Sequence, residues 1–224
     1  MGLTGLRRFA LLPITLAIAL VFSACSMQNP AKRIKEAKKV EHSIGVVVQS
    51  SGYPKVSRKS RHYMLSNQSR IYRGDIIETD SDSRMKIEMN DGSTFILGHN
   101  THFVIHYYKY ESKALTARIG FTNGSLLTST VKDTLAKKTQ FEITTPLGVI
   151  GAQSAEFWSG FTFGDNRLDT VMISGTKIYI ENDHGEMEIT EHKTGTTVIG
   201  NSAPKNPETG SKRTLNEALL TIIF

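Results

Sequence analysis

The sequence has little cysteine and few long apolar runs, and both scarcities limit what the chain can be. Cys25 is the single cysteine among 224 residues, so a disulfide within the chain is excluded even in an oxidising compartment. The run Phe9–Phe22 has 14 residues and contains Pro13, whereas a membrane-spanning helix needs about 20 apolar residues. Apolar residues make up 39% of the chain, below the usual ~45% but above the range of disordered proteins. The fold must therefore depend on a hydrophobic core alone.

Metal-binding patterns are also missing. His99, His102 and His106 are close in sequence. On a strand, however, His102 and His106 lie on one face about 13 Å apart, and His99 points to the other face. The three imidazoles cannot then bind one ion. We predict neither a metal nor a cofactor.

Catalytic signatures are missing too, apart from one partial match. No Gly-x-Ser-x-Gly elbow or phosphate-binding loop is present. Ser129 and Lys132 match the Ser-x-x-Lys motif of penicillin-binding proteins and β-lactamases, and Lys193-Thr194-Gly195 matches their Lys-Thr-Gly motif. The serine of that motif begins a helix, whereas Ser129 lies in a run of β-forming residues. We predict no catalytic residue, and a serine-type envelope hydrolase is the less favoured alternative.

The N-terminal residues have the order of a bacterial lipoprotein signal peptide. Arg7 and Arg8 precede the apolar run, the small pair Ser23-Ala24 follows it, and Cys25 comes next. The basic residues hold the N-terminus on the cytoplasmic side, and small residues fit the pocket of a signal peptidase. We predict a signal peptide at residues 1–24 and a membrane anchor formed by lipid, including palmitate, on Cys25. The alternative is an ordinary signal peptide in which Cys25 carries no lipid.

Residues 25–43 have the composition of a basic tether. Within them Ala31–Val40 reads AKRIKEAKKV, with five basic residues and the single acid Glu36. Such a stretch buries too little apolar surface to order itself, although its charge also suits anionic headgroups or cell-wall carboxylates. Removal of Arg7 and Arg8 lowers the formal charge from +6 to 6 − 2 = +4, and this surplus is too small to imply nucleic acid.

From Ile44 onward the sequence has the pattern of strands and turns. Met85, Ile87 and Met89 alternate with charged residues, and Asn90-Asp91-Gly92 forms a turn signal after them. This pattern predicts an all-β fold, an antiparallel β-sandwich or jelly-roll-like domain of many short strands. Further short runs predict strands at Ile44–Gln49, Asp75–Thr79, Ser93–Leu97, His102–Tyr110, Ser125–Val131, Gln140–Thr144, Phe157–Phe163, Val171–Ser174, Thr176–Asn182, Glu186–Thr190 and Thr196–Ile199.

One short helix is expected at the C-terminus. Thr214 and Glu217 have the spacing of a capping box. Leu215, Ala218, Leu219 and Ile222 then share one helical face. We expect this face to cover an open end of the sheet, with partner binding as the alternative.

A set of short motifs in a fixed order resembles the FecR-type periplasmic domain. The chain has a Gly-Asp-x-Ile-x-Thr segment at Gly74–Thr79, an Asp-Gly-Ser hairpin at Asp91–Ser93 and a Thr-Pro-x-Gly-Val-x-Gly segment at Thr145–Gly151. The resemblance covers roughly Ile44–Gly200. The family usually continues with Arg-Gly-Thr-x-Phe, and Ser154 stands here in place of that glycine. A serine disfavours positive φ, so we expect a different backbone at this turn.

Each shared motif also has a structural reason. Asp75 can cap backbone amides in a turn, and Asp91-Gly92 suits a hairpin. Pro146 fixes φ and Gly148 frees it, as a strand that bends at a corner requires. The resemblance therefore marks structural residues and no catalytic ones. These residues are Gly74, Asp75, Asp91, Gly92, Ser93, Thr145, Pro146, Gly148 and Gly151.

The resemblance and the anchor together predict a function. FecR proteins are periplasmic and relay transporter occupancy to an anti-sigma system, and that relay needs a spanning helix. With residues 1–24 removed as a signal peptide, we expect a lipid-anchored sensing or scaffolding module on the periplasmic face of the outer membrane, because Ser26 follows Cys25. A cell-wall-associated structural lipoprotein is the alternative.

The predicted organisation has four parts. Residues 1–24 are the signal peptide, 25–43 the lipidated cysteine and tether, 44–200 the FecR-like domain, and 201–224 a loop and the C-terminal helix. We expect an envelope protein as the partner, with peptidoglycan as another candidate. The aromatic residues to consider as contacts are Phe103, Tyr107, Tyr108, Tyr110 and Trp158, although core packing is their default explanation.

Overall fold

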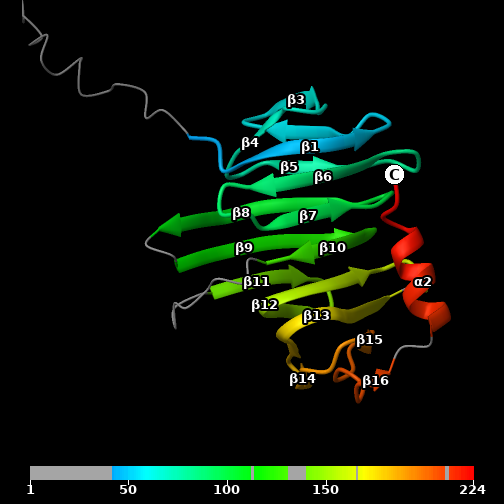
Figure 1. Cartoon of the computed structure of the whole chain (residues 1–224). Coiled ribbons are helices and arrows are strands. Elements are labelled where there is room, and N and C mark those ends of the chain that lie inside the picture. The colour runs from blue at the N-terminus through cyan, green and yellow to red at the C-terminus, as the bar shows by residue number, and fades with distance from the viewer. Residues whose placement is uncertain (1–41, 112–113, 131–139, 165, 210–211) are drawn as a thin grey trace, which may run out of the picture. The chain divides into compact units, whose positions relative to one another are not determined.

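A computed structural model of the chain describes residues 42–111, 114–130, 140–164, 166–209 and 212–224 (Figure 1). All of them belong to the unit Glu41–Phe224. The predicted signal peptide, Cys25 and nearly all of the predicted tether lie outside the described residues, and so does Lys132. The domain boundaries therefore stay predictions.

The described chain consists of β-strands with one helix near its C-terminus, which confirms the predicted fold class. The helix is α2 (Lys212–Leu220). The strands are β1 (Gly45–Ser51), β2 (Lys55–Arg58), β3 (Arg61–Met64), β4 (Arg70–Ile71), β5 (Ile76–Glu78), β6 (Arg84–Met89), β7 (Thr94–Leu97), β8 (His102–Glu111), β9 (Ala114–Asn123), β10 (Ser125–Ser129), β11 (Gln140–Thr145), β12 (Gly148–Gly160), β13 (Arg167–Asn182), β14 (Gly185–Ile189), β15 (Thr194–Ile199) and β16 (Glu208–Thr209).

All of these strands are connected in one curled, hydrogen-bonded sheet. Its main path runs β3-β2-β5-β8-β9-β11-β12-β10-β7-β6-β1-β4, and β13 branches from β12 and carries β14 and β15. The pairs are antiparallel except for β9 and β11, which run parallel. The sheet is thus mixed, although the hairpin pattern of the sequence predicts antiparallel pairs alone.

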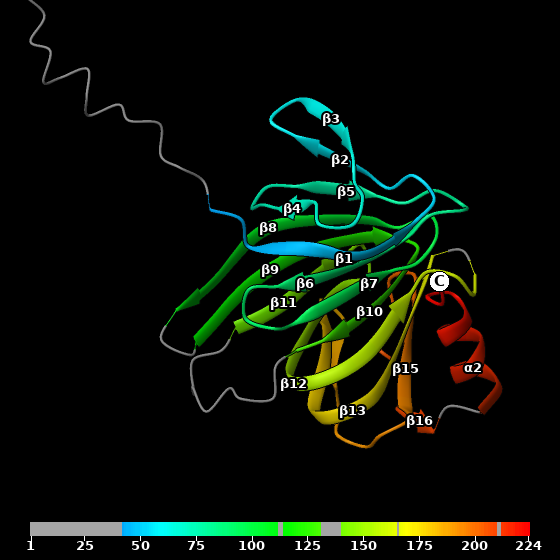
Figure 2. The ribbon, with the colours of Figure 1, turned by 45° about the horizontal axis from the view of Figure 1, so that its top comes forward.

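The two longest strands, β12 and β13, curve the sheet around its core. Along one edge, β12 pairs first with β11, through Gly148–Gly151, and then with β10, through Glu156–Gly160. Its other edge pairs with β13 along nearly its whole length. Strands β11, β9 and β8 therefore continue from one half of β12, and β10, β7 and β6 from the other half (Figures 1 and 2). The predicted short runs at 171–174 and 176–182 are parts of β13, and the run at 157–163 overlaps the end of β12, which stops at Gly160.

The long pair bends where Ser154 and Gly175 come close together. Ser154 has φ 46° and Gly175 has φ 117°. A Cβ atom on Gly175 would collide with the Ser154 carbonyl oxygen and lie 2.5 Å from the Ala155 Cα. The expectation that serine would change the backbone is wrong in one respect, because Ser154 adopts the positive φ that glycine takes freely. The pairing of β12 with β13 on both sides of the bend holds Ser154 in this conformation.

The main core lies inside the curled sheet. Met85, Ile87 and Met89 are all buried, as their alternation predicts, and Phe95 packs against Phe103 and Phe141 at ring-centroid distances of 5.2 and 6.2 Å. Side chains of every long strand contribute to this cluster. A cluster of this size explains how a chain without a disulfide can hold one fold.

Helix α2 packs against the outer face of the sheet and forms a second, smaller apolar cluster. Trp158 is fully buried and its Nε1 donates to Thr221 Oγ1 at 3.1 Å. Ala218 and Ile222 of the predicted helical face are buried with it. The helix covers a face of the sheet beside β12 and β13, not an open end (Figure 2). It begins at Lys212, two residues before the predicted cap at Thr214.

Candidate functional site

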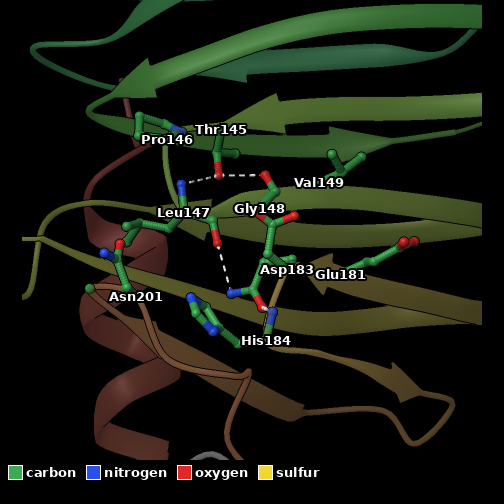
Figure 3. Close-up of a pocket in the computed structure, with 11 residues that line it drawn as sticks. Thr145, Pro146, Leu147, Gly148, Val149, Glu181, Asp183, His184 and Asn201 are labelled. Atoms are coloured by element: carbon green, nitrogen blue, oxygen red, sulfur yellow. Dashed lines mark hydrogen bonds between the residues drawn. The ribbon is translucent and has the colours of Figure 1, made fainter.

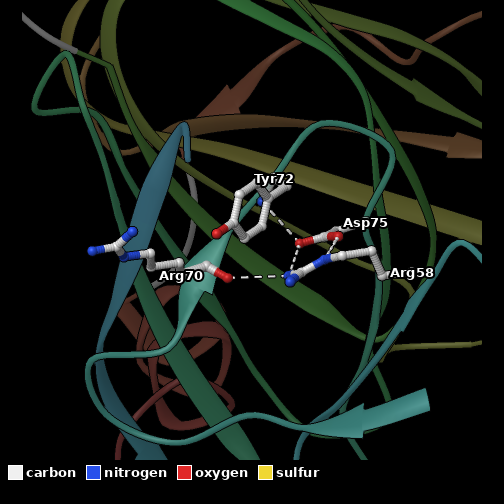
Figure 4. A network of polar contacts seen from close by, with 4 residues as sticks. All are labelled: Arg58, Arg70, Tyr72 and Asp75. Carbon is white, nitrogen blue, oxygen red and sulfur yellow. Dashed lines mark hydrogen bonds and ion pairs between the residues drawn. The ribbon is translucent and has the colours of Figure 1, made fainter. Parts of the chain in front are cut away.

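The most strongly buried charge in the described chain belongs to the Gly-Asp motif. Asp75 is 0% exposed and accepts from Arg58 Nε and Arg58 Nη2, both at 2.6 Å. Its Oδ2 also accepts from the Tyr72 backbone N–H at 2.9 Å, and Arg58 donates to the Arg70 carbonyl oxygen (Figure 4). These hydrogen bonds with Asp75 raise the pKa of Arg58 above its ordinary value. One carboxylate thus joins β2 to the turn before β5.

Aromatic rings and arginines extend from this ion pair across the neighbouring strands. The Arg58 guanidinium lies 4.2 Å from the centroid of the Tyr72 ring. Three further contacts of this kind lie nearby, and each distance is within the range of cation–π attraction: Arg58 and Tyr63 at 6.0 Å, Arg73 and Tyr107 at 4.5 Å, and Arg118 and Tyr107 at 5.7 Å.

We call this set the Arg–Tyr surface and define it as Arg58, Tyr63, Tyr72, Arg73, Tyr107 and Arg118. It comprises two groups of contacts, one from β3, β2 and the turn before β5, and the other from the same turn, β8 and β9. Arg73 and Arg118 are exposed, and Tyr63 is 45% exposed. Arginine and tyrosine are enriched at binding hot spots. The Arg–Tyr surface is the strongest candidate binding site among the described residues.

The Asp-Gly-Ser motif forms the turn between β6 and β7 and is held by a distant tyrosine. Asp91 Oδ2 accepts from Ser93 Oγ at 2.8 Å, and Asp91 Oδ1 accepts from the hydroxyl of Tyr108 on β8 at 2.7 Å. Burial raises the pKa of the Tyr108 hydroxyl far above its ordinary value, and the charge of Asp91 raises it further. Tyr108 is therefore a neutral donor, and the contact is structural.

The Thr-Pro-x-Gly motif forms the turn from β11 to β12 beside a shallow pocket. Thr145 Oγ1 donates to the Gly148 carbonyl oxygen at 2.7 Å and accepts from the Leu147 N–H at 3.2 Å (Figure 3). Gly148 and Pro146 line the pocket, which also includes His184 and has a volume of about 240 Å³. This volume is below the range of roughly 300–1,000 Å³ that is usual for small-molecule sites, so the pocket offers little for specific binding.

The last motif residue, Gly151, serves side-chain packing. A Cβ atom there would overlap the ring of Tyr179 on β13. Gly74 differs, because its φ of 81° occurs in open space. The nine predicted motif residues thus lie in three separate places and form no common site.

The predicted aromatic contacts divide by burial. Phe103, Tyr108 and Trp158 are buried in the two apolar clusters or beneath the Asp91 turn. Tyr110 is 43% exposed, and Tyr107 is half-buried within the Arg–Tyr surface. Sequence reasoning did not single out Arg58, Arg73 or Arg118. On β9 the apolar residues Leu115, Ala117 and Ile119 alternate with Thr116 and Arg118. This alternation predicts that Arg118 is exposed.

His102 and His106 make separate contacts, and Ser129 of the serine motif lies on a strand. His102 Nδ1 is 2.9 Å from Thr122 Oγ1, and His106 lies over Gly120. Within the described ranges there is no group of three His, Cys, Asp or Glu side chains that could hold a metal. Ser129 lies on β10 and pairs with Glu156 of β12. The hydrolase motif requires a serine that begins a helix. Ser129 does not meet this requirement.

Comparison with known proteins finds a family match in the central part of the chain. Residues 75–176 match the family model described as FecR protein. This match lies within the predicted range Ile44–Gly200. A search of curated proteins finds no significant match. No helix of the part that the structure describes is long and apolar enough to cross a membrane.

Two crystal structures of candidate anti-sigma factors from Parabacteroides distasonis ATCC 8503 have a similar fold. Each has a TM-score of 0.52 and covers 64% of this chain. The identities are 12% and 13%, and the chain spans 63% and 64% of the lengths of those two proteins. At such identities the likeness shows the fold alone.

Proposed function

Because residues 75–176 match the FecR family model, we propose that this protein is a non-catalytic binding module of the bacterial cell envelope, with a role in sensing or regulation. The proteins of similar fold are candidate anti-sigma factors, which supports a regulatory role over an enzymatic one. The buried motif side chains of Asp75, Ser93 and Thr145 make hydrogen bonds that hold strands and turns together. The activity that we propose for this module is therefore binding to another protein.

The observation that carries this proposal is the Arg–Tyr surface. Its arginines present fixed positive charge beside flat rings, which suits an acidic partner surface that also buries apolar area. Arg58 is held in place by the buried Asp75, so the surface is preorganised before binding. Preorganised side chains lose less conformational entropy when a partner binds. We therefore propose an acidic region of another envelope protein as the partner.

We further propose that lipid on Cys25 holds the domain at the membrane and that residues 26–43 act as its tether. The order Arg7, Arg8, apolar run, Ser23-Ala24 and Cys25 supports the anchor. Ser26 favours the outer membrane as the destination. The basic residues of the tether would then lie near anionic headgroups.

Changing Cys25 to alanine tests the anchor. We expect the wild-type protein to incorporate labelled palmitate and to sediment with membranes, because acyl chains bury their methylene groups in the bilayer. The Cys25→Ala protein should lose the label and leave the membrane fraction. Ser26→Ala is the matched control and should keep the label. A Cys25→Ala protein that stays with membranes without label would contradict the proposed anchor.

Charge reversal of Arg73 and Arg118 tests the binding surface. After mild crosslinking in cells, we expect the wild-type protein to copurify with a discrete envelope protein. The double variant Arg73→Glu with Arg118→Glu should reduce that yield by roughly tenfold or more, since rim and hot-spot arginines set both encounter rate and affinity. Lys205→Glu, on an exposed residue elsewhere, is the control. An unchanged yield for the double variant would exclude the Arg–Tyr surface as the binding site.

A further inference from the structure

The first part of the described chain carries positive charge only. The segment 42–74 contains six Lys and Arg residues and no Asp or Glu. Three of the six have an acid opposite them or another partner: Lys55 (opposite Glu78), Arg58 (paired with Asp75) and Lys59. A fourth, Arg73, lies against the Tyr107 ring. The remaining two, Arg61 and Arg70, are exposed and form no ion pair within the described chain.

These two arginines lie at the same end of the fold. Arg61 pairs with Arg58 across the β2–β3 hairpin, and Arg58 Nη2 donates to the Arg70 carbonyl oxygen at 3.0 Å. Strand β4 therefore lies beside the hairpin that carries Arg61. In the row of the sheet that contains Arg70, Glu88 is two strands away, or about 10 Å, on the other side of Val46. No acid thus lies directly opposite either arginine in a neighbouring strand.

The predicted tether enters the fold at this end. The Ile44 N–H donates to the Ile71 carbonyl oxygen at 2.9 Å, and Asn90 Nδ2 donates to the Ser43 carbonyl oxygen at 2.7 Å. Ile71 follows Arg70 on β4. If lipid on Cys25 holds the chain at a membrane, the domain is therefore attached beside its two unpaired arginines.

The opposite end of the sheet is acidic. The segment Glu181–Glu191 contains five Asp and Glu residues and no Lys or Arg, and only Glu188 among them pairs with a lysine, Lys177. Figure 1 shows β3 and β4 at the top of the sheet and β14 at the bottom. An anionic bilayer attracts the first end and repels the second. The charge distribution therefore favours one orientation of the anchored domain.

Strand β3 adds exposed apolar surface to the positive end. Tyr63 is 45% exposed and Met64 is 54% exposed. A tyrosine suits the boundary of a bilayer, because its ring is apolar and its hydroxyl stays in water. Proteins that bind at a membrane surface combine such apolar area with attraction to anionic lipids. Both components are present on this hairpin.

We propose that the domain docks onto anionic phospholipid headgroups through a β2–β3 patch, defined as Arg61, Tyr63, Met64 and Arg70. This docking rests on the proposed lipid anchor, which keeps the patch close to the bilayer. The acidic β14 end then points away from the membrane. The second group of the Arg–Tyr surface is not part of the patch and stays available to the envelope partner: Arg73, Tyr107 and Arg118.

Fluorescence of the anchored protein tests the docking. The lipidated protein is reconstituted into vesicles of phosphatidylcholine alone or of phosphatidylcholine mixed with phosphatidylglycerol. Met64→Cys carries an environment-sensitive fluorophore, because lipid occupies the sulfur of Cys25 and position 64 is then the single free thiol. A phospholipid with a nitroxide near its headgroup quenches a fluorophore at the bilayer surface. We expect phosphatidylglycerol to raise the quenching at position 64 about fivefold or more.

Matched variants separate docking from mere attachment. His184→Cys, an exposed position in the turn before β14, should show little quenching in either kind of vesicle. The double variant Arg61→Glu with Arg70→Glu should return quenching at position 64 to its level in phosphatidylcholine alone. Lys193→Glu with Lys205→Glu makes the same change of charge at exposed residues elsewhere and should keep most of the quenching. High salt should lower it. If the label at position 64 impairs folding, Tyr63→Cys provides a second position.

Equal quenching at positions 64 and 184, or quenching at position 64 that does not depend on phosphatidylglycerol, would overturn the docking. The anchor is scored separately, because the lipidated protein should float with vesicles of phosphatidylcholine alone. Loss of flotation would contradict the anchor together with the docking that rests on it. Flotation without quenching contradicts the docking alone. No partner protein is present, so neither result bears on binding through Arg73 and Arg118.

Discussion

Changing Gly175 to alanine is expected to destabilise the protein by about 3–5 kcal/mol, a loss at the upper end for a single substitution. The added Cβ would collide with the backbone of Ser154 and Ala155 on β12. Backbone atoms in a paired strand cannot move aside as the end of a flexible side chain can. The collision would separate the two longest strands at the bend that turns the sheet over its core.

Urea unfolding of the purified protein measures this loss, and two companion variants isolate its cause. Gly164 also has a positive φ, of 153°, but a Cβ there would meet no atom closer than 3.6 Å. Gly164→Ala should therefore cost only about 1 kcal/mol. Ser154→Gly should stabilise the protein by about 0.5–1 kcal/mol, because it relieves the left-handed backbone of a non-glycine residue. Equal losses for Gly175→Ala and Gly164→Ala would show that the bend is not the critical contact.

Changing Asp75 to alanine is expected to cost about 3 kcal/mol, because removing one member of a buried ion pair leaves the other without compensation. Arg58 would lose two hydrogen bonds of 2.6 Å, and the Tyr72 N–H would lose its acceptor. The estimate lies at the lower end of the range for buried pairs, since the Arg58 side chain is 25% exposed. Urea unfolding again measures the loss.

An exposed ion pair provides the matched control for Asp75. Lys109 and Glu111 are 2.9 Å apart with side chains 47% and 69% exposed, so Glu111→Ala should change the free energy of unfolding very little. Asp75→Asn keeps one oxygen acceptor and should fall between the two alanine variants. If Asp75→Ala costs no more than Glu111→Ala, the network does not hold the Arg–Tyr surface in place.

Local pattern predicts those parts of this fold in which neighbours in sequence determine the structure. The strict alternation of Met85, Ile87 and Met89 matches a strand with one buried face, and Asn90-Asp91-Gly92 closes its hairpin. The apolar residues Leu215, Ala218, Leu219 and Ile222 likewise lie on one side of α2 and of the turn after it, packed with Trp158. In each case the period of apolar residues is sufficient, because the buried side is the same along the whole element.

The β2–β3 hairpin was missed because its sequence gives no such signal. Its turn residues Lys59 and Ser60 have φ of 49° and 60°, whereas turns of this kind are normally recognised by asparagine or glycine. All four residues of β3 are exposed, so no apolar alternation marks it. Strands β12 and β13 were predicted as shorter runs for a related reason. Their buried face changes at the bend, which interrupts the period of two.

The Arg–Tyr surface was also beyond sequence reasoning. Gly74-Asp75 is recognisable as a turn, but the main partner of its carboxylate lies on another strand, 17 residues earlier. Which arginine reaches Asp75 depends on how β2 pairs with β5. Arg118 and Tyr107 meet across β8 and β9 in the same way. Tertiary pairing, which no local pattern encodes, assembles this candidate site.

Position-specific photo-crosslinking in cells tests the central claim, that a FecR domain at the membrane binds an envelope protein through the Arg–Tyr surface. A photoreactive residue replaces Arg118 in one protein and Glu191, an exposed residue near β14, in another. We predict a discrete adduct with one envelope protein from position 118, and little or none of that adduct from position 191. The same adduct in equal yield from both positions, or from position 191 alone, would contradict the account.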